Sequence, residues 1–578
     1  MMLKDIYDPL SEYVDVFHDR FKEVAENTFS KIAEEASIDI EANRATCHEI
    51  CQNEKAISCC TSRIDTFMAW SILLWVFVVC SIAVILFAFD IIETWIVIVV
   101  CILDVVAVWY FFFKMYPKFR DIKKKRADYE DICKRLKKEA WNQMAPLNGL
   151  YDWDLLMRMM SETVPRLEFD PYFTTQRLAD LRSTYNWDDS FNEDRSVIYS
   201  HSGLINGNPF VFCRTRKMNM ESKIYSGSLT IHWTETQVDS EGKSYTVQRS
   251  QVLTASMRAP YPVYYEKTRL IYGNIAAPDL VFNRKKSGLA GNEESLSYKY
   301  KRHSLRRKSR KLTKSDFAML SNEEFEVAFN TSDRNNNQQF SLLFTPLAQE
   351  SMLKLLKDYK VGYGDDFDFH KNKMINTIIS DHLQNIDLNI NPNTYSNFDY
   401  DKAKENFYSI NANYFRAIYF ALAPLLCVPM YQQIRSHNDI YGHDMKMHSS
   451  FWEHEALANF WGQKHFQHPD CITDCILKTD QKDGPNDDST INVYAYGYKS
   501  ERRLSYISVY GGDGYYHDVP VYWDEYIPVS GKGQMRIKED NDESEQVITQ
   551  KQRINRINKI LLRSNLDIYR RHIASKVI

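Results

Sequence analysis

The sequence lacks the complete motifs by which common classes of enzyme are identified. There is no Gly-x-Ser-x-Gly nucleophile elbow and no protein-kinase motif set, and the glycine-rich stretch 511–514 is not followed by the Gly-Lys-Ser/Thr of a phosphate loop. His454-Glu455 begins like the zinc-protease motif, but Ala458 stands where the second histidine is needed. These absences favour an interaction or scaffold protein over an enzyme.

Net charge is also small. The 72 Lys and Arg and 76 Asp and Glu leave −4 over 578 residues, so the chain as a whole has no strong attraction for nucleic acid or for acidic partners. With 44% hydrophobic and 26% charged residues, the composition outside two apolar runs is that of an ordinary globular protein. The length beyond those runs is enough for two or three domains with cores of their own.

The apolar runs are the strongest signal in the chain. Phe67 to Phe89 carries no charged residue, and Thr94 to Phe113 carries one, Asp104. At about 1.5 Å per residue, each run is long enough to cross a hydrocarbon core roughly 30 Å thick as a helix. The link 90–93 is too short for anything but a tight turn, so we predict a hairpin of two membrane-spanning helices.

The residues that flank the runs predict the orientation. The hairpin tip carries only Asp90 and Glu93, whereas a cluster of basic residues follows the second run. This cluster comprises Lys114, Lys118, Arg120, Lys123, Lys124, Lys125 and Arg126. Because excess Lys and Arg mark the cytoplasmic side, we expect a cell-membrane protein with both termini cytoplasmic. Most of the 11 cysteines then lie in a reducing compartment, and no disulfide framework is expected.

Hydrophobic periodicity predicts an α+β protein: a membrane hairpin, a helical stalk and a large cytoplasmic mixed domain with antiparallel sheet. The predicted regions are an N-terminal cytoplasmic helical region (1–66), spans at 67–89 and 94–113, a helical stalk and connector (114–195), a β-rich α+β domain (196–360), a helical then β-rich region (361–530), and a charged loop with a C-terminal helix (531–578). We expect the apolar stripe over 10–24 to pack against the similar stripe over 119–136 as an antiparallel stalk.

Finer assignments follow from alternation and turn residues. Residues 229–247 read as a β-hairpin around a turn at 239–242, and 491–526 as strands. The other assignments are strands at 325–329 and 340–344, a helix at 348–359, a mostly helical stretch at 370–470, a solvated loop at 536–547 and a helix at 549–578. Within the helical stretch, Pro424 and Pro429 make 417–430 a buried core segment rather than a third span.

Asp104 is unusual because an acidic side chain near the middle of a span costs about 2.5–3.5 kcal/mol on insertion scales. Matching depths across the hairpin places Cys80 and Ser81 nearby. The residue is compatible with a proton or ion relay, with a contact that joins several hairpins in a homo-oligomer, or with a protonated side chain satisfied by a local hydroxyl. Transport through two spans would require an oligomer.

Histidines are dense between residues 437 and 468: His437, His443, His448, His454, His465 and His468. Cys471 and Cys475 follow, but the ligand spacing fits no familiar zinc framework, so we expect structural histidines and no metal site. If the protein is instead a membrane-tethered hydrolase, its site would lie among residues 454–475 or near Asp513, His517 and Asp518.

A basic segment, Lys299 to Lys314, contains no acidic residue. On a membrane-tethered domain it could contact anionic lipid headgroups, with nucleic acid as the competing ligand and a solvated surface as the simplest interpretation.

Several short runs resemble a family of two-span membrane proteins from low-GC Gram-positive bacteria and mycoplasmas. These runs are 198–203, 205–210, 271–274, 277–280, 343–348, 423–426, 429–433 and 454–459. The segment 324–353 is similar to part of a broader bacterial domain of unknown function. The resemblance spans most of residues 60–530 and implies a membrane location, but it brings no catalytic residue, cofactor or substrate with it.

Overall fold

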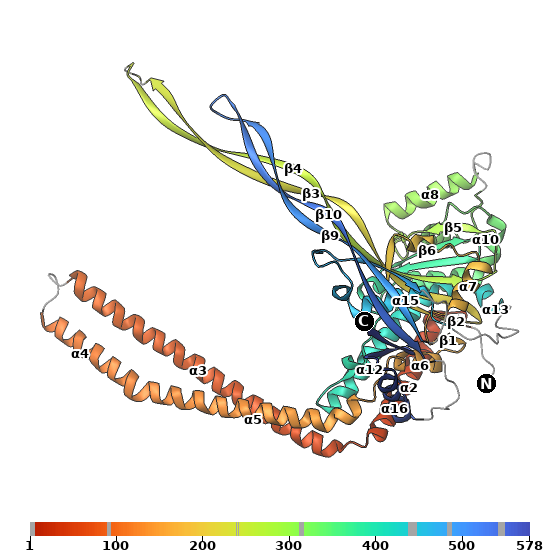
Figure 1. The fold of residues 1–578 in the computed structure, drawn as a ribbon, viewed down its shortest axis with the longest axis horizontal. Helices are drawn as coiled ribbons and strands as arrows, with labels where there is room; N and C mark the ends of the chain where they lie inside the picture. The colour runs from red at the N-terminus through yellow and green to blue at the C-terminus, as the bar shows by residue number, and fades with distance from the viewer. Residues whose placement is uncertain are drawn as a thin grey trace.

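The computed structural model describes residues 6–88, 94–238, 240, 242–310, 317–436, 448–481, 488–540 and 549–578. Figure 1 shows a body of helices and sheets from which two long projections leave on the same side, a helical hairpin and a β arm. Every pairing between the described strands is antiparallel. The molecule is therefore the mixture of helix and antiparallel sheet that the periodicity predicts.

The helical hairpin consists of α3 (Ile40–Ala88) running out from the body and α4 (Thr94–Tyr110) running back. A π-helical turn, Phe111–Met115, joins α4 to α5 (Tyr116–Asn148), which returns to the body. Both long helices have the length and the apolar composition needed to cross a membrane. Near the body, α3 and α5 pack on each other around Ile50 and Leu136, and we call this paired part of the hairpin the stalk.

The N-terminal stripe is helical, but its partner differs from the prediction. Pro9–Glu12 (α1), a π-helical turn at Tyr13–Phe17 and His18–Ala36 (α2) precede α3. Phe21 stacks on Phe415 of α12 with ring centroids 4.2 Å apart, so the stripe belongs to the core of the body and not to the stalk. Helix α2 ends at Ser37, whose left-handed backbone lets the chain turn into α3.

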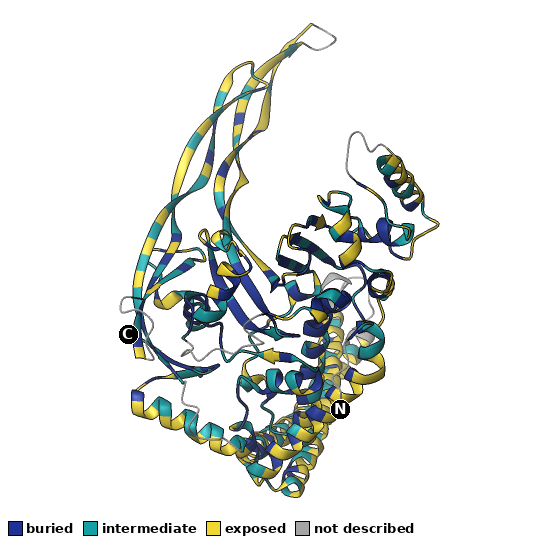
Figure 2. Ribbon diagram, turned by 90° about the vertical axis from the view of Figure 1, so that its right-hand side faces the viewer, coloured by how far each residue is buried: buried dark blue, intermediate teal, exposed yellow. Residues whose placement is uncertain are grey.

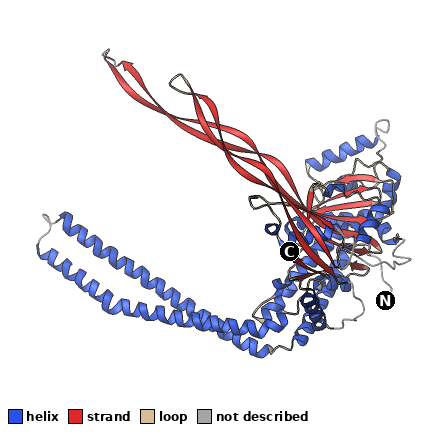
Figure 3. Ribbon diagram, in the orientation of Figure 1, coloured by secondary structure: helices blue, strands red, loops and turns tan. Residues whose placement is uncertain are grey.

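The remaining helices cover the sheets of the body (Figure 3). They are α6 (Leu155–Thr163), α7 (Thr175–Ser183), α8 (Leu296–Arg310), α9 (Glu323–Phe329), α10 (Asn337–Leu343), α11 (Pro346–Lys357), α12 (Tyr400–Leu426), α13 (Pro429–Gln433), α15 (Phe451–Trp461) and α16 (Gln550–Ser564). The second half of α12 is buried on all sides, which agrees with its assignment as a core segment and not a third span.

Two predicted strands are helices. Residues 325–329 lie in α9 and 340–344 in and just after α10, because Asn322 and Asn336 each accept a backbone N–H and cap these helices. The phenylalanines of both helices are buried in the core. Their spacing in the sequence includes alternate apolar positions, which is the pattern expected of a strand. The stretch 370–470 is predicted to be mostly helical, but it begins with two strands. Residues 536–539, predicted as part of a loop, belong to a strand. The tail, predicted as one helix, forms two short strands after residue 565.

The described strands form two sheets. A seven-stranded sheet has the order β1-β2-β3-β4-β7-β6-β5 and a five-stranded sheet the order β11-β12-β10-β9-β8. The first contains β1 (Leu167–Phe169), β2 (Arg195–Ile205), β3 (Asn208–Val238), β4 (Ser244–Gly273), β5 (Val281–Arg284), β6 (Phe367–Asn372) and β7 (Ile375–Ser380). The second contains β8 (Ile476–Gln481), β9 (Asp488–Tyr510), β10 (Tyr516–Glu539), β11 (Ile568–Arg570) and β12 (Ile573–Val577).

The arm forms because one hairpin of each sheet has strands much longer than the strands beside it. Strands β3 and β4 remain paired out to Val238 and Ser244, whereas β2 stops pairing with β3 at Lys217. Strands β9 and β10 remain paired out to Tyr510 and Tyr516, well beyond β8 and β12. Figure 2 shows buried residues concentrated in the body and mixed exposure along the arm.

The two hairpins pack on each other face to face. Their shared core contains Tyr225, Ile231 and Leu253 of the first hairpin and Val519 and Val521 of the second. A Cβ atom on Gly227 would lie 1.9 Å from the Pro520 carbonyl oxygen, so glycine is needed where the backbones approach. The tip of the second hairpin also donates a hydrogen bond of 2.7 Å from the Gly512 N–H to Gln251. The arm is therefore one two-layered unit.

Candidate functional site

The outer face of the second hairpin is the largest aromatic surface of the arm. Side chains alternate along a strand, so those of Ile507 and Val521 point to the first hairpin and those of Tyr506 and Tyr522 point away. Tyr506 is 64% exposed and Tyr516 is 73% exposed. We define the tyrosine face as the exposed outward residues Tyr496, Leu504, Tyr506, Tyr510, Tyr516 and Tyr522.

Cross-strand pairing brings five of these residues together toward the tip, while Tyr496 lies nearer the body, opposite Ser530. Tyr510 lies opposite Tyr516, with ring centroids 5.2 Å apart in an edge-to-face arrangement, and Leu504 lies opposite Tyr522. Tyr506 lies opposite Pro520, which cannot donate a ladder hydrogen bond. Contiguous exposed apolar surface of this kind marks an interaction site in soluble domains, and tyrosine is enriched in such sites because it combines a large ring with a polar tip.

A groove of about 420 Å³ lies at the base of the arm, where the two hairpins separate. It is lined by Met218 and Tyr264 from the first hairpin and by Tyr496, Tyr498 and Pro528 from the second. The Tyr264 hydroxyl lies 3.1 Å from Thr473 Oγ1, and burial raises the pKa of this phenol to about 12. Tyr496, the member of the tyrosine face nearest the body, lines this groove as well.

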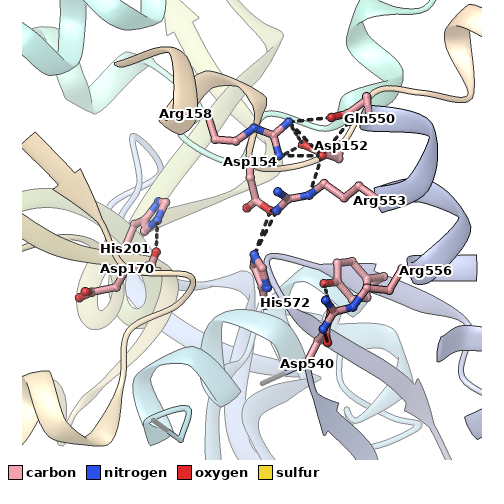
Figure 4. A network of polar contacts seen from close by, with 11 residues as sticks. Asp152, Asp154, Arg158, Asp170, His201, Asp540, Gln550, Arg553, Arg556 and His572 are labelled. Atoms are coloured by element: carbon pink, nitrogen blue, oxygen red, sulfur yellow. Dashed lines mark hydrogen bonds and ion pairs between the residues drawn. The ribbon is translucent and has the colours of Figure 1, made fainter. Parts of the chain in front are cut away.

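A network of ion pairs joins α16 to the residues that follow α5 and to the end of β10 (Figure 4). Strand β10 ends next to Asp540, which accepts a hydrogen bond of 2.5 Å from Arg556 of α16. One turn earlier on α16, Arg553 contacts Asp152 at 3.0 Å and Asp154 at 2.6 Å. Both aspartates follow directly after α5, the returning helix of the stalk. Helix α16 thus connects the arm strand to the stalk through charged contacts.

The electrostatics of this network favour its charged form. Burial alone would raise the pKa of Asp154, but the hydrogen bond from His572 and the charges of His572, Arg553 and Arg158 together hold it well below its ordinary value. Figure 4 shows these groups turned toward one another. The neighbouring cavity, lined in part by Asp152 and His201, holds only about 20 Å³. The charged groups of the network are paired with one another, an arrangement that favours a structural role.

A second buried cluster fixes the C-terminal strands. Glu453 of α15 accepts hydrogen bonds from Arg571 at 2.6 Å, from Arg570 at 3.3 Å and from Ser200 at 2.9 Å. Burial and the adjacent Arg571 lower the pKa of Arg570 to about 9. Neither cluster could have been found from sequence patterns, because each joins segments hundreds of residues apart.

The residues singled out as possible catalysts are dispersed. Asp513 and His517 lie 2.8 Å apart at the tip of the second hairpin, and Asp518 bonds to Ser508 on the outer face. His454 lies 2.8 Å from Ser449 Oγ, and both are buried. Glu539 accepts from Ser449 and not from His454, so the three groups are not ordered as a catalytic triad. Burial lowers the pKa of His454 to about 4.

The cysteine pair is brought together, and of the histidines His448 lies 2.9 Å from Glu539, the carboxylate that also accepts from Ser449 beside His454. Cys471 Sγ and Cys475 Sγ lie 3.5 Å apart next to Gly497, while His468 caps the backbone of Asp470. Among the residues that the structure describes, no group of three or more His, Cys, Asp or Glu side chains is arranged to hold a metal ion. His437 and His443 lie outside the described residues.

Asp104 and the basic segment have distinct surroundings. Asp104 Oδ2 lies 2.7 Å from Ser81 Oγ, as depth matching across the hairpin predicts, and its other oxygen is buried without a described partner. Residues 299–310 of the basic segment form most of α8, and 311–314 fall outside the described residues.

No protein-family model, curated protein or solved structure matches this chain.

Proposed function

We propose that this protein is a membrane-anchored interaction protein that displays the β arm as a binding surface. In this proposal the helical hairpin holds the chain in the cell membrane with both termini in the cytoplasm, and the tyrosine face binds a protein partner. The observation that carries the proposal is that face, an aromatic surface on a projecting hairpin that stays exposed among the residues that the structure describes.

The location of the arm follows from its backbone. Beyond the last pairing of β10 with β12, at Met535, the outer edge of β10 has no strand beside it among the described residues. Unpaired N–H and C=O groups are too costly in hydrocarbon, so the arm must lie in water next to the membrane. Open strand edges are also places where a partner strand can add, and they supplement the tyrosine face.

Rigid mounting supports the same function. The partly buried Arg553 joins α16 to the residues that follow the stalk, and Glu453 joins the C-terminal strands to the body. A binding surface held at a fixed orientation loses less entropy on association than a flexible one. The protein can therefore serve as a scaffold that positions its partner relative to the bilayer.

Co-purification with a matched control tests the proposal. Tyr506→Ser with Tyr522→Ser removes two rings of the tyrosine face, while Ser228→Ala with Thr254→Ala changes a cross-strand pair on the outer face of the first hairpin. Full-length protein is isolated in mild detergent, and bound proteins are quantified by mass spectrometry. We expect one stoichiometric partner that is lost only in the tyrosine variant. Equal recovery with both variants would overturn the assignment of this face.

The predicted orientation has its own test. Protease added to intact cells should leave the body and the C-terminus uncut, because both are expected on the cytoplasmic side. Loss of the C-terminal portion under these conditions would contradict the positive-inside assignment.

A further inference from the structure

Helix α8 (Leu296–Arg310) forms a second surface that the arm does not involve. It contains seven Lys and Arg residues and no Asp or Glu. Tyr298 and Leu305 are buried against Phe317 and Val327, which fixes one side of the helix on the body. Arg306 adds a two-point contact to Glu323, with the shorter distance 2.5 Å. The helix is thus held in place with a defined outer side.

The outer side combines cations with one ring. The exposed residues are Leu296, Ser297, Lys299, Tyr300, His303, Ser304, Arg306, Arg307 and Arg310, and most of them recur at the spacing of one helix face. Tyr300 is 77% exposed, with basic side chains on both sides of it in sequence. In the described part of the chain, Arg302, Arg307 and Arg310 make no ion pair, so these charges are available to an external anion.

We propose that α8 binds single-stranded nucleic acid. Arg307 and Arg310 on the outer face, with the partly exposed Arg302 at its edge, offer positive charge to the regular negative charge of a phosphate backbone. An exposed ring beside such cations offers a stacking surface for an unpaired base, which a duplex does not present. This inference is independent of the partner proposed for the arm.

The position of α8 favours nucleic acid over lipid. Figure 1 places α8 on the far side of the body from the helical hairpin. The bilayer that anchors the chain is therefore beyond its reach, although a separate anionic membrane would present the same charge. Small net charge of the whole chain does not oppose the proposal, because the relevant charge is local to one helix.

Binding to a labelled oligouridine of about 20 nucleotides tests the proposal, with full-length protein in phosphatidylcholine nanodiscs and a salt series. Arg302→Gln, Arg307→Gln and Arg310→Gln together should reduce the slope of log affinity against log salt by about 2, since each phosphate contact contributes about 0.7 on a single strand. Tyr300→Leu should weaken binding about tenfold with an unchanged slope. Replacing the three arginines with lysine should restore the slope.

A matched variant removes equal charge elsewhere. Lys551→Gln, Lys559→Gln and Arg563→Gln lie on exposed positions of α16 and should leave oligouridine affinity unchanged. Equal losses with the α8 and α16 variants would overturn the proposal, because the attraction would then be unspecific. Flotation with phosphatidylglycerol vesicles that depends on α8, without oligouridine binding, would overturn it in favour of a second membrane.

Discussion

The helical hairpin and the β arm are two projections of similar form and opposite chemistry. Each is a pair of antiparallel elements that leaves the body on the same side (Figure 1). The helices satisfy their own backbone hydrogen bonds and expose apolar side chains such as Trp70 and Val105, as a lipid environment requires. The arm leaves strand edges open and buries only a small core between its hairpins. This contrast underlies our proposal that one projection lies in lipid and the other meets a partner in water.

Loss of the buried ion pairs of Glu453 with Arg570 and Arg571 should have the largest effect on stability. Glu453→Gln removes the charge that compensates the buried Arg570 and Arg571, and breaking a buried pair of this kind costs about 3–5 kcal/mol. We expect a marked loss of unfolding free energy, measured by denaturation of the full-length protein in detergent. Glu501→Gln on the exposed arm, where the partner Arg503 is 51% exposed, should change stability very little, because water and salt screen an exposed pair. Similar losses would mean that the buried cluster does not fix the body.

The packing of the two hairpins should give the next effect. Gly227→Val places side-chain atoms against the Pro520 backbone and should cost about 1–3 kcal/mol by overpacking. Amide hydrogen exchange should accelerate at residues 519–523 and remain unchanged in the helical hairpin. Ser228→Ala, on the opposite face of the same strand, is the control. Unchanged exchange at 519–523 would show that the hairpins are not docked in solution.

Acid should destabilise the body through His201. This side chain is buried, its Nε2 lies 3.0 Å from the Asp170 carbonyl oxygen, and burial lowers its pKa to about 3. In the unfolded chain the pKa of histidine is about 6.5, so the unfolded state binds the extra proton between these values. Unfolding free energy should therefore fall as pH decreases from about 6.5 toward 4, by up to about 1.4 kcal/mol per pH unit.

His201→Gln keeps a donor for the Asp170 carbonyl and cannot be protonated, so it should make that pH dependence less steep. The buried His454, whose pKa is lowered to about 4, should account for a remaining slope of the same sign. Stability is measured at each pH for both proteins, with the exposed His303→Gln as control. A pH slope unaffected by His201→Gln would remove His201 as its source.

The polar contact inside the helical hairpin should give the smallest effect. Asp104→Leu removes the contact with Ser81, and interhelical hydrogen bonds in membranes contribute only about 0.6 kcal/mol on average. Hydrogen exchange of the hairpin in nanodiscs should rise slightly, and Asp104→Asn should preserve most of the protection. A loss of several kcal/mol would instead mean that Asp104 organises an assembly of several hairpins.

The sequence predicts the local helices and strands better than it predicts which of them pack on each other. Apolar length identifies the helical hairpin, and alternation identifies the strands of both arm hairpins. The segments of α9 and α10 are predicted as strands because they carry apolar residues at alternate positions. The asparagines that cap them are the sequence signal for a helix. The stripe over 10–24 is helical as predicted, but periodicity cannot tell whether its partner is α5 or α12.

The tyrosine face lies in a segment whose tyrosine-rich strands are evident, yet which tyrosines are exposed depends on the docking of a hairpin more than 200 residues away. The pairing of Arg553 with Asp152 and Asp154 likewise joins distant segments and leaves no periodic trace. Such contacts follow from tertiary packing and need the structure.

Site-specific photo-crosslinking in living cells tests the central claim most directly. A benzophenone amino acid replaces Tyr506 on the tyrosine face or, in a parallel sample, Ser228 on the outer face of the first hairpin, at exposed positions of the same arm. The account predicts a discrete protein adduct from position 506 and none from position 228. Adducts of equal yield at both positions, or none at position 506, would contradict the assignment of the tyrosine face as the binding surface.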